Sequence, residues 1–483
     1  MATTVDDTSL KLLQLGGLIQ DTIAQFVTLR NSPGEGNEGT LPSKPLFDAQ
    51  RTLLSAAGMI TELVSEPQGR LLEVSSQYFE ARALHIVASH RVPDLIAKNE
   101  PGGLSIETLA SQTGIESRKL SRLMRCLCSI HIFKEIDEDV FANNEISKSL
   151  VGNEFLRSYI LLFGLDIYSS SDYLPRYLDD PARGHSYAVD TTAWQSAVNT
   201  SKPRWEWLEE KTSACDIRDG LNGTDGNLSA YPGIFGPELN SAKAQAKSGG
   251  ETLLSRPEHA IFGQAMVGGG RVFGQAQLYD FPWASLGPST VVDVGGGAGG
   301  FCLQLSHICP DLRFIIQDRA PVLELAKKEV WPAENPGALA AGRVQFVPHD
   351  FFEPNPTPNA AVYWLRYILH DWSDDYCVRI LEAIQPAMGP KSRILICDQV
   401  MNTTRGCAEL PGAPEPLPRN WGYFTRYSHQ RDLAMMSIIN GIERKPAELR
   451  NLATRAGLRL NRIWDCRSQV GLVELVLPDS EIV

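Results

Sequence analysis

The stretch with the clearest chemical signature runs from Val291 to Gly300 and reads VVDVGGGAGG. An apolar strand there leads into glycines at positions 295, 296, 297, 299 and 300, and a helical pattern follows. Glycine lets the backbone turn sharply and approach a ligand without a Cβ atom in the way. The spacing also satisfies the Gly-x-Gly-x-x-Gly pattern. The loop therefore predicts a nucleotide-like cofactor but does not distinguish NAD from S-adenosylmethionine.

Two further strand ends carry groups that suit such a cofactor. Asp318 closes the run RFIIQD, about 20 residues beyond the glycine loop, where a carboxylate can accept both ribose hydroxyls of either cofactor. Asp350 and Phe351 follow the run VQFVPH, where a carboxylate and a ring would contact the edge and face of an adenine. Strand ends of a doubly wound sheet open onto one crevice, so we expect these segments to form a single site.

The segments that must position these groups alternate between strand and helix patterns. Five β-rich runs begin at or after Thr290, and helical spacing separates them. They are TVVDV, RFIIQD, VQFVPHD, AAVYWL and RILICDQV. The alternation predicts an α/β fold in which residues 281–483 form a Rossmann-like, doubly wound parallel sheet domain.

The part of the chain before this domain is expected to be mostly helical. Residues 1–45 should form one helix and a flexible linker, because an apolar face at helical spacing is followed by NSPGEGNEGTLPSKP. Residues 46–175 should form a helical domain. Residues 176–280 should be a helical connection, with a mobile insert near 209–252 where the sequence turns polar and glycine-rich.

A winged-helix layout is predicted within the helical domain. Ser105 begins a helix that Gly114 ends, Ser117 begins a second helix, and a hairpin follows over Phe133–Phe141. Such layouts often bind DNA, and the second helix carries basic residues. However, the chain is acidic overall and its remainder looks enzymatic. We therefore interpret the region as a packing or dimerisation module.

Composition limits the classes of partner. The net charge of the 483 residues is −12, which argues against nucleic acid as the main partner. The 9 cysteines are scattered, as is usual for reduced thiols of a cytoplasmic protein. Neither a secretory leader nor an apolar stretch of the ~20 residues that a membrane span needs is evident. The histidines show no ligand spacing, so no metal is expected.

The stretch RYILHDWSDDYC, from Arg366 to Cys377, completes an ordered set of motifs. With the glycine loop and the strand-end acids, it resembles the plant and fungal small-molecule O-methyltransferases of the caffeic-acid type. The resemblance covers most of the chain outside 209–252, and the segment 103–150 looks like that family's dimerisation domain. It implies S-adenosyl-L-methionine as cofactor, a small hydroxylated acceptor, and a homodimer formed through the N-terminal helices.

The resemblance also implies roles for single residues. His370 falls on the catalytic base, and Asp398 and Glu443 match the two acids that flank it. Asp398 is a departure, because plant members commonly have Glu there, and Arg366 stands where they often have Lys. The implied cofactor-binding residues are Asp293, Gly295, Gly296, Gly297, Asp318, Asp350, Phe351, Arg366, Asp371 and Trp372. Phe262, Met266 and Met435 match positions that line the acceptor pocket.

This set suits methyl transfer to oxygen. A phenol has a pKa of about 10, and a neutral histidine can accept its proton as the oxygen attacks. A carboxylate on the other ring nitrogen would fix the tautomer. Three alternatives stay open: an NAD-dependent oxidoreductase, a winged-helix regulator, and a cofactor-binding relative that catalyses a pericyclic or dehydrative step without methylating. The expected acceptor is a small aromatic or polyketide-type metabolite.

Overall fold

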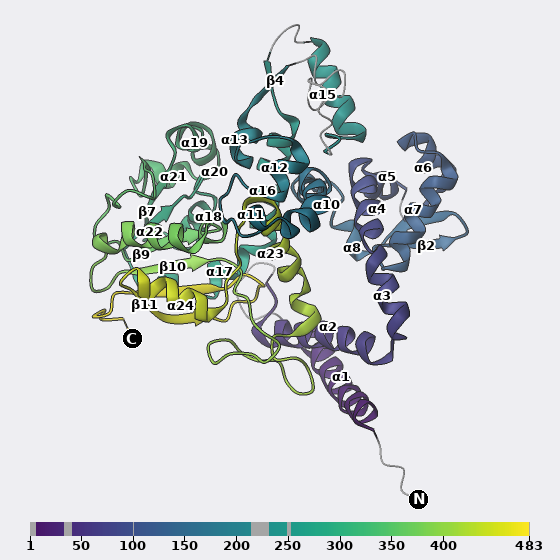
Figure 1. Ribbon diagram of the computed structural model, residues 1–483, viewed down its shortest axis with the longest axis horizontal. Helices are drawn as coiled ribbons and strands as arrows, with labels where there is room; N and C mark the ends of the chain where they lie inside the picture. The colour runs from purple at the N-terminus through teal and green to yellow at the C-terminus, as the bar shows by residue number, and fades with distance from the viewer. Residues whose placement is uncertain (1–5, 33–40, 100, 214–230, 249–252, 483) are drawn as a thin grey trace, which may run out of the picture. The chain divides into compact units, whose positions relative to one another are not determined.

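The computed structural model describes residues 6–32, 41–99, 101–213, 231–248 and 253–482. The chain divides into two compact units, and many of their elements are labelled in Figure 1. The first unit comprises Met1–Ser65, Val272–Met436 and Asn440–Val483, and the second comprises Glu66–Arg271 and Ser437–Ile439. The chain thus re-enters the first unit near the predicted boundary at 281. By contrast, the division at Ser65 differs from the predicted boundary at 46.

A seven-stranded sheet forms the centre of the first unit. Its strands are β6 (Thr290–Val294), β7 (Arg313–Asp318), β8 (Val344–Pro348), β9 (Val362–Arg366), β10 (Arg393–Cys397), β11 (Arg459–Trp464) and β12 (Leu472–Val476). The order is β11-β12-β10-β9-β6-β7-β8. Strands β6 to β10 pair in parallel and are the five predicted runs, which confirms the Rossmann-like sheet. The antiparallel edge strands β11 and β12 were not predicted.

Two apolar cores cover the opposite faces of this sheet. Successive strand residues point to opposite faces, so Trp364 lies in one core and Tyr363 in the other. One core includes residues of α18 (Gly300–Ile308), α19 (Ala320–Leu325) and α20 (Trp331–Glu334). The other includes residues of α22 (Asp374–Ile384) and α24 (Pro446–Arg455). This unit also contains α17 (Gln275–Tyr279), α21 (Pro336–Ala340), α23 (Arg426–Ile439), whose residues Ser437–Ile439 belong to the second unit, and the short helical segments η1 (Trp283–Leu286), η2 (Ala326–Val330), η3 (Leu369–Asp371), η4 (Gln385–Ala387) and η5 (Gly422–Thr425).

The strand order brings the predicted site segments to one edge. From β6 the chain proceeds to β7 and β8 on one side, whereas β9 and β10 lie on the other side of β6. A crevice forms where the direction of winding reverses, outside the carboxyl ends of the strands. The glycine loop after β6 and the segment after β9 leave neighbouring strands at this point.

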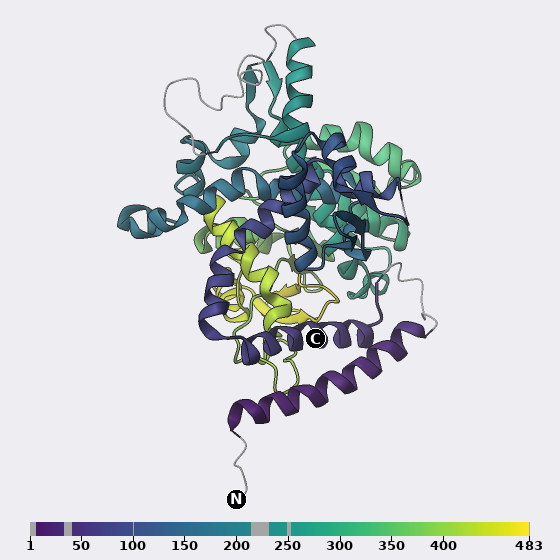
Figure 2. The ribbon, with the colours of Figure 1, turned by 90° about the vertical axis from the view of Figure 1, so that its right-hand side faces the viewer.

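Two N-terminal helices belong to the first unit. Helices α1 (Asp7–Asn31) and α2 (Lys44–Val64) pack along each other, as Figure 2 shows. Asp6 caps α1 by accepting a hydrogen bond from the Ser9 N–H at 2.9 Å. The buried Leu15 and Ala56 of these helices share a small core with Ala413, Leu417 and Trp421. The helices therefore cover the long segment between β10 and α23.

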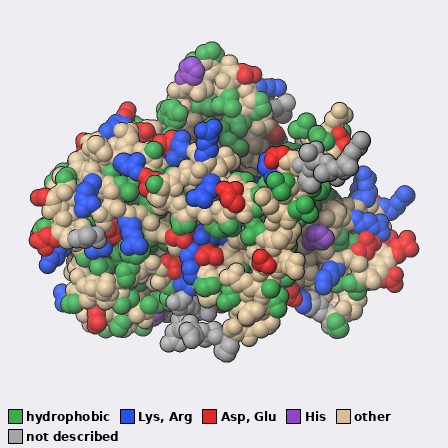
Figure 3. Space-filling model, turned by 90° about the horizontal axis from the view of Figure 1, so that it is seen from below, with side chains coloured by type: hydrophobic (Ala, Val, Ile, Leu, Met, Phe, Trp, Pro, Cys, Tyr) green, Lys and Arg blue, Asp and Glu red, His purple; other side chains and the backbone are tan. Residues whose placement is uncertain are grey.

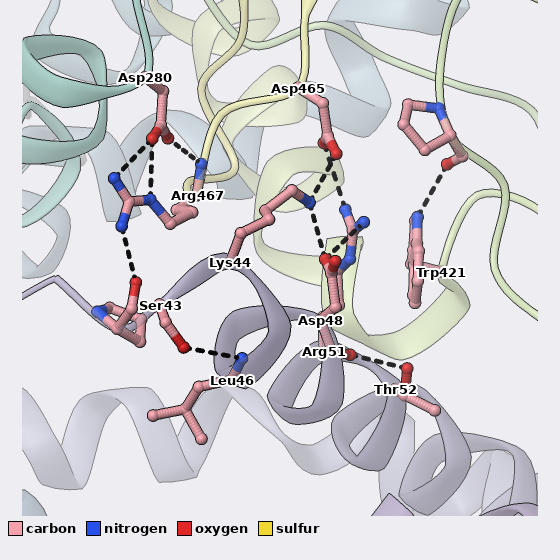
Figure 4. A network of polar contacts seen from close by, with 12 residues as sticks. Ser43, Lys44, Leu46, Asp48, Arg51, Thr52, Asp280, Trp421, Asp465 and Arg467 are labelled. Atoms are coloured by element: carbon pink, nitrogen blue, oxygen red, sulfur yellow. Dashed lines mark hydrogen bonds and ion pairs between the residues drawn. The ribbon is translucent and has the colours of Figure 1, made fainter. Parts of the chain in front are cut away.

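Ion pairs fix α2 to the C-terminal part of the same unit (Figure 4). Asp465 lies 2.6 Å from Lys44 Nζ and 3.4 Å from Arg51 Nη1. The buried Arg467 pairs with Asp280 at 2.7 Å and donates to the Pro42 carbonyl at 2.9 Å. The buried Arg467 pair holds the chain just before α2, and the more exposed Asp465 contacts tie α2 itself to the same region.

The second unit is mostly helical, with two small sheets. Its helices are α3 (Pro67–Ser76), α4 (Tyr78–Ser89), α5 (Val92–Ala97), α6 (Ile106–Thr113), α7 (Ser117–Ser129), α8 (Glu145–Lys148), α9 (Glu154–Gly164), α10 (Asp166–Asp179), α11 (Pro181–Gly184), α12 (Ala193–Val198), α13 (Arg204–Glu209), α15 (Gly236–Ser248) and α16 (Pro257–Phe273), which ends in the first unit. Its strands are β1 (Leu104–Ser105), β2 (Phe133–Asp137), β3 (Val140–Asn143), β4 (Lys211–Ser213) and β5 (Leu253–Ser255).

The predicted winged-helix layout is present in this unit. Ser105 caps α6, and Gly114 ends it with φ 74°. Helix α7 starts at Ser117 as predicted, but its cap is Glu116, whose carboxylate accepts from two backbone N–H groups. Strands β2 and β3 form the predicted hairpin. A core that includes Leu120, Met124 and Leu127 joins α7 to the rest of the module.

The predicted mobile insert is described only in part. Residues 214–230 and 249–252 lie outside the described residues. The described part is more regular than predicted, because β4 pairs with β5 and residues 236–248 form α15. Polar composition hid this helix, whose apolar residues are few.

Charged and apolar side chains are interspersed on the face shown in Figure 3, so the excess of acidic residues is not gathered into a single field there. No helix within the described ranges is long and apolar enough to span a membrane.

We predict opposite effects for two glycines of α16. An alanine Cβ at Gly268 would lie 2.4 Å from the Phe155 carbonyl oxygen, whereas one at Gly263 would meet nothing within 4 Å. Gly268→Ala should lower the free energy of unfolding by about 1–3 kcal/mol, the scale of overpacking. Gly263→Ala should raise it by about 1 kcal/mol, because glycine disfavours helix interiors. Denaturant unfolding checks both, and a stabilising Gly268→Ala would contradict this packing of α16 on α9.

Candidate active site

The glycine loop after β6 has the geometry of a ligand cradle. Gly295, Gly297 and Gly299 have φ values of 69°, 59° and 74°, which disfavour other residues. A Cβ at Gly296 would lie 2.4 Å from the Asp293 side chain, and one at Gly295 would lie 2.6 Å from Ile368. Glycine is therefore needed here both for the turn and for close approach of the neighbours.

Asp318 joins the second predicted strand end to this loop. Its carboxylate accepts from the Gly297 N–H at 2.8 Å and from the Arg319 N–H at 2.7 Å. The side chain is half-buried at the carboxyl end of β7. The structure thus brings Asp318 and the glycine loop together, as the prediction of a single site requires.

Asp293 is the buried acid beneath the loop. One of its oxygens, Oδ2, is buried and has no hydrogen-bond partner. Burial raises the pKa of Asp293 to about 7, although Cys302 and the positive charge of Arg366 act to lower it. Arg366 therefore lies close enough to act on this acid, and the two predicted cofactor residues belong to one electrostatic group.

Aromatic residues lie next to the loop at the third strand end. A Cβ at Gly295 would lie 3.6 Å from the Phe351 ring. That ring meets the Trp372 ring edge-on, with centroids 6.1 Å apart. Asp350 is exposed and accepts from the Phe352 N–H at 3.0 Å. Phe351 and Trp372 thus form an apolar wall beside the cradle.

His370 lies between two carboxylates. Its Nδ1 is 2.8 Å from Glu443 Oε1, and its Nε2 is 3.2 Å from Asp371 Oδ1. The imidazole is buried, with 4% of its surface exposed. Burial alone would lower the pKa of His370, but the charges of Glu443, Asp371 and Asp398 outweigh it and raise the pKa to about 9. The free site therefore favours the imidazolium, which can donate to both acids.

Helix α23 holds Glu443 in place. The Glu443 N–H donates to Asp432 Oδ1 at 2.9 Å, and Arg431 Nε lies 3.8 Å from Glu443 Oε1. Burial acts to raise the pKa of Glu443, but His370 and Arg431 hold it below its ordinary value. Glu443 is therefore a buried carboxylate that stays ionised beside the histidine.

The structure gives Asp398 a partner other than the histidine. Asp398 Oδ1 accepts from the Tyr367 N–H at 3.0 Å, and burial raises the pKa of Asp398 to about 6. Tyr367 has φ 55°, and its ring lies 5.4 Å from the His370 ring. Asp398 thus acts on His370 electrostatically and supports the strained turn before it, whereas the resemblance implied that it flanks the base.

Arg444 is a buried residue of the site that was not predicted. Its guanidinium donates to the carbonyls of Leu369 at 2.9 Å and Trp372 at 2.7 Å. It also pairs with Asp374 at 2.9 Å. Arg444 thereby fixes the backbone on both sides of His370. In the sequence, only its position directly after Glu443 could have marked Arg444 as a site residue. Charged residues between a loop and a helix are otherwise too common to indicate a site.

The predicted acceptor residues fall in both units. Met435 lies on α23 and is buried. Phe262 and Met266 lie on α16 in the second unit, where Phe262 is half-buried with Arg204 5.3 Å from its ring centroid. The Met266 side chain is 44% exposed. The exposed thioether of Met266 therefore has surface that a bound molecule could contact.

Comparison with known proteins identifies the family. Residues 251–459 match the O-methyltransferase domain, and residues 72–153 match the O-methyltransferase dimerisation domain. The O-methyltransferase tpcA of Aspergillus fumigatus is 54% identical over 97% of this chain and 96% of its own length. The O-methyltransferase gedA of Aspergillus terreus is 54% identical over 95% of this chain and 92% of its own length. The chain therefore belongs to the S-adenosylmethionine-dependent O-methyltransferase family.

Solved structures agree with the fold. A methyltransferase of calicheamicin biosynthesis, CalO1, crystallised with S-adenosylhomocysteine, is 25% identical with a TM-score of 0.59, covering 86% of this chain and 99% of its own. A structure described as a pericyclic reaction enzyme is 20% identical with a TM-score of 0.63, covering 96% and 100%. The latter likeness concerns the fold alone.

These findings decide several predictions made from the sequence. S-adenosyl-L-methionine is the cofactor, so the reading as an NAD-dependent oxidoreductase is wrong. The helical region is the family's dimerisation domain, which supports the homodimer and not a DNA-binding regulator.

We predict that Asp293 makes stability depend on pH. Because its folded pKa is raised from 3.8 to about 7, the folded protein holds a proton that the unfolded chain releases. The free energy of unfolding should therefore fall between these pH values, by at most about 1.4 kcal/mol per pH unit. Asp293→Asn should remove this component. Denaturant unfolding at pH 4–8 checks it, and equal slopes for both proteins would contradict the assignment.

Proposed function

We propose that His370 is the general base that removes the proton of the acceptor hydroxyl during methyl transfer. The observation that carries the proposal is the buried contact of 2.8 Å between His370 Nδ1 and Glu443 Oε1. With Nδ1–H donated to this carboxylate, Nε2 is the nitrogen that accepts the proton. Glu443 then stabilises the imidazolium that forms.

The residues around the glycine loop fit the cofactor. The cradle of Gly295, Gly296 and Gly297 has no room for a Cβ at its first two positions, and Asp318 lies on its rim. Beneath the cradle, the buried Oδ2 of Asp293 has no hydrogen-bond partner within the described residues and leaves a polar atom for a ligand. S-adenosylmethionine, when bound, supplies a methyl group on a positively charged sulfur.

The aromatic residues and Arg366 complete the proposed cofactor site. Phe351 and Trp372 offer apolar faces suited to an adenine ring, and Asp350 offers a carboxylate to its edge. Arg366 acts on Asp293 and limits the negative charge of the group. Asp371 differs from the others, because its contact of 3.2 Å is to the base. We therefore assign Asp371 a role in setting the protonation state of His370 and not in binding the cofactor.

Asp371 sets the starting state of the base. A neutral imidazole that donates Nδ1–H to Glu443 would present a lone pair to the Asp371 oxygen 3.2 Å away. The imidazolium avoids this repulsion, so the free enzyme stores a proton on His370 at neutral pH. An acceptor hydroxyl that replaces Asp371 at Nε2 removes one reason for this charge. His370 then releases its stored proton to solvent water, and the neutral imidazole can receive the acceptor's proton.

We propose that the acceptor is a small aromatic or polyketide-type hydroxyl compound. The candidate lining residues Phe262, Met266 and Met435 are apolar and polarisable, which suits a flat apolar body. None of these side chains carries a charge that would compensate the charges of a peptide or nucleic acid.

The homodimer is proposed to use the N-terminal helices. Leu71, Leu72 and Phe79 on α3 and α4 are 72%, 71% and 60% exposed. Exposed apolar side chains of this size on neighbouring helices are typical of a surface that another chain covers.

His370→Gln should bind S-adenosylmethionine as tightly as the parent enzyme and lose turnover by about 100-fold or more, the scale of general-base catalysis. Glu443→Gln should lose less, because the imidazole remains but its tautomer is no longer fixed. Calorimetry gives cofactor affinity, and labelled cofactor with a panel of phenols gives turnover. Unchanged turnover in His370→Gln would remove this histidine from the mechanism.

The same assay separates methylation from the alternative without methyl transfer. Methylation converts one cofactor molecule for each product molecule. Product formed while the cofactor is not consumed would favour a pericyclic or dehydrative step instead.

We predict that kcat/KM rises with pH up to about 9, because this ratio reports the free enzyme and the pKa of His370 lies at about 9. Asp371→Asn removes one of the negative charges that favour the imidazolium, so the midpoint should move to lower pH. A pH profile of kcat/KM from 6 to 10 for both proteins checks this. A midpoint that stays in place or rises in Asp371→Asn would show that Asp371 does not control the base.

A further inference from the structure

The N-terminal helices lie outside both matched family domains yet belong to the unit that holds His370. The family domains cover 72–153 and 251–459, whereas α1 ends at residue 31 and α2 ends at residue 64. Their role is therefore not given by the family domains. Their contacts within the first unit point to one.

Arg51 on α2 anchors the segment that leads into α23. Its guanidinium lies 3.8 Å from the centroid of the Trp421 ring, a close cation–π contact. Asp48 at 2.7 Å and Asp465 at 3.4 Å fix the guanidinium (Figure 4). One turn later, Ser55 Oγ donates to the Trp421 carbonyl at 2.6 Å. The ring and the backbone of Trp421 are thus held by the same helix.

The turn after Trp421 packs equally closely on α2. A Cβ at Gly58 would lie 2.1 Å from the Cβ of Tyr423, so only glycine admits this residue of η5. The Phe47 and Phe424 rings meet edge-on, with centroids 5.8 Å apart. Helix α2 therefore determines where η5 lies.

Helix α23 begins directly after η5 and carries the residues that hold Glu443. Arg431 lies 3.8 Å from the Glu443 carboxylate, and Asp432 accepts the Glu443 N–H at 2.9 Å. Arg431 also lies 4.7 Å from the centroid of the Tyr367 ring, which faces His370. A shift of α23 would move both neighbours of the histidine.

We propose that α2 is a positioning element of the active site, and that Arg51 and Gly58 act on His370 through Trp421, α23 and Glu443. None of these groups on α2 touches the reacting atoms. This inference rests on the proposed role of His370 as base, but its physical part concerns only the placing of Glu443 beside the imidazole.

The direction of the effect follows from the charges around His370. Glu443, Asp371 and Asp398 all favour the imidazolium, and Glu443 is the largest of these contributions. Asp371 and Asp398 follow β9 and β10, whereas Glu443 depends on Arg431 and Asp432 of α23. Releasing α23 should therefore weaken the effect of Glu443 on His370 and leave the effects of Asp371 and Asp398 in place. The pKa of His370 should fall toward its ordinary value as Glu443 moves away.

The experiment compares Arg51→Met with the parent enzyme by two readouts. One is the titration of the His370 ring proton by NMR in the full-length protein, assigned by its loss in His370→Gln. The other is the pH profile of kcat with saturating S-adenosylmethionine and a phenol acceptor. We expect the His370 midpoint to fall by about one pH unit or more and plateau kcat to fall about tenfold, with cofactor affinity unchanged.

Matched controls come from α1. Lys11→Met also removes a cation from an ion pair, the exposed contact with Asp7, and should change neither readout. Gly58→Ala should reproduce the Arg51→Met effect by displacing Tyr423. Gly17→Ala, where a Cβ meets nothing within 4 Å, should not.

Each outcome decides the proposal. Parent-like titration and kcat in Arg51→Met or Gly58→Ala overturn it, as do equal shifts in Lys11→Met or Gly17→Ala. If Arg51→Met fails to bind the cofactor, Arg51→Lys takes its place. That variant keeps the charge but lacks the planar group that stacks on Trp421, and it should give an intermediate shift; no shift overturns the proposal. If His370→Gln keeps its turnover, the base assignment fails, while the NMR titration still tests Arg51.

Discussion

The contact between His370 and Glu443 is the interaction on which the site depends. Both side chains are buried, so neither charge has water to stabilise it, and each requires the other. The pair also needs a second layer, because an ionised carboxylate in this place must be held by further groups. Arg431 lies 3.8 Å from the Glu443 carboxylate, Asp432 accepts the Glu443 backbone N–H, and Arg444 holds the backbone around His370. The chemistry of the site is thus a property of several elements at once.

In the proposed mechanism, the second carboxylate on His370 gives the site two states. With Asp371 on Nε2 the histidine is charged and cannot act as a base. Replacement of Asp371 by a neutral hydroxyl lowers the preference for the charge. This arrangement couples deprotonation of the histidine to the arrival of the acceptor. Under this proposal, a histidine with a pKa of about 9 in the free enzyme can serve a reaction near neutral pH.

Much of the fold could be predicted, and so could the meeting of the glycine loop with Asp318 and Phe351, because both leave local signals. The five parallel strands are nearly continuous apolar runs, and the glycine loop needs its residues at fixed spacing. The edge strand β11 could not be predicted, since RLNRIW mixes basic and apolar residues. Arg431 and Asp432 were also missed. They are ordinary charged residues of a helix, and only tertiary contact with Glu443 distinguishes them. Asp398 matched a family position, but its hydrogen bond from the Tyr367 N–H forms only because of the backbone turn at Tyr367, which the sequence does not indicate.

The division of the chain has a consequence for synthesis. The second unit is almost continuous, from Glu66 to Arg271, so nearly all of it leaves the ribosome early. Helices α1 and α2 are made before it, but their core partners Ala413, Leu417 and Trp421 come some 350 residues after Ala56. The apolar face of this helical pair therefore lacks its final neighbours until most of the chain has been translated. Apolar surface that is exposed in this way during synthesis is prone to aggregation.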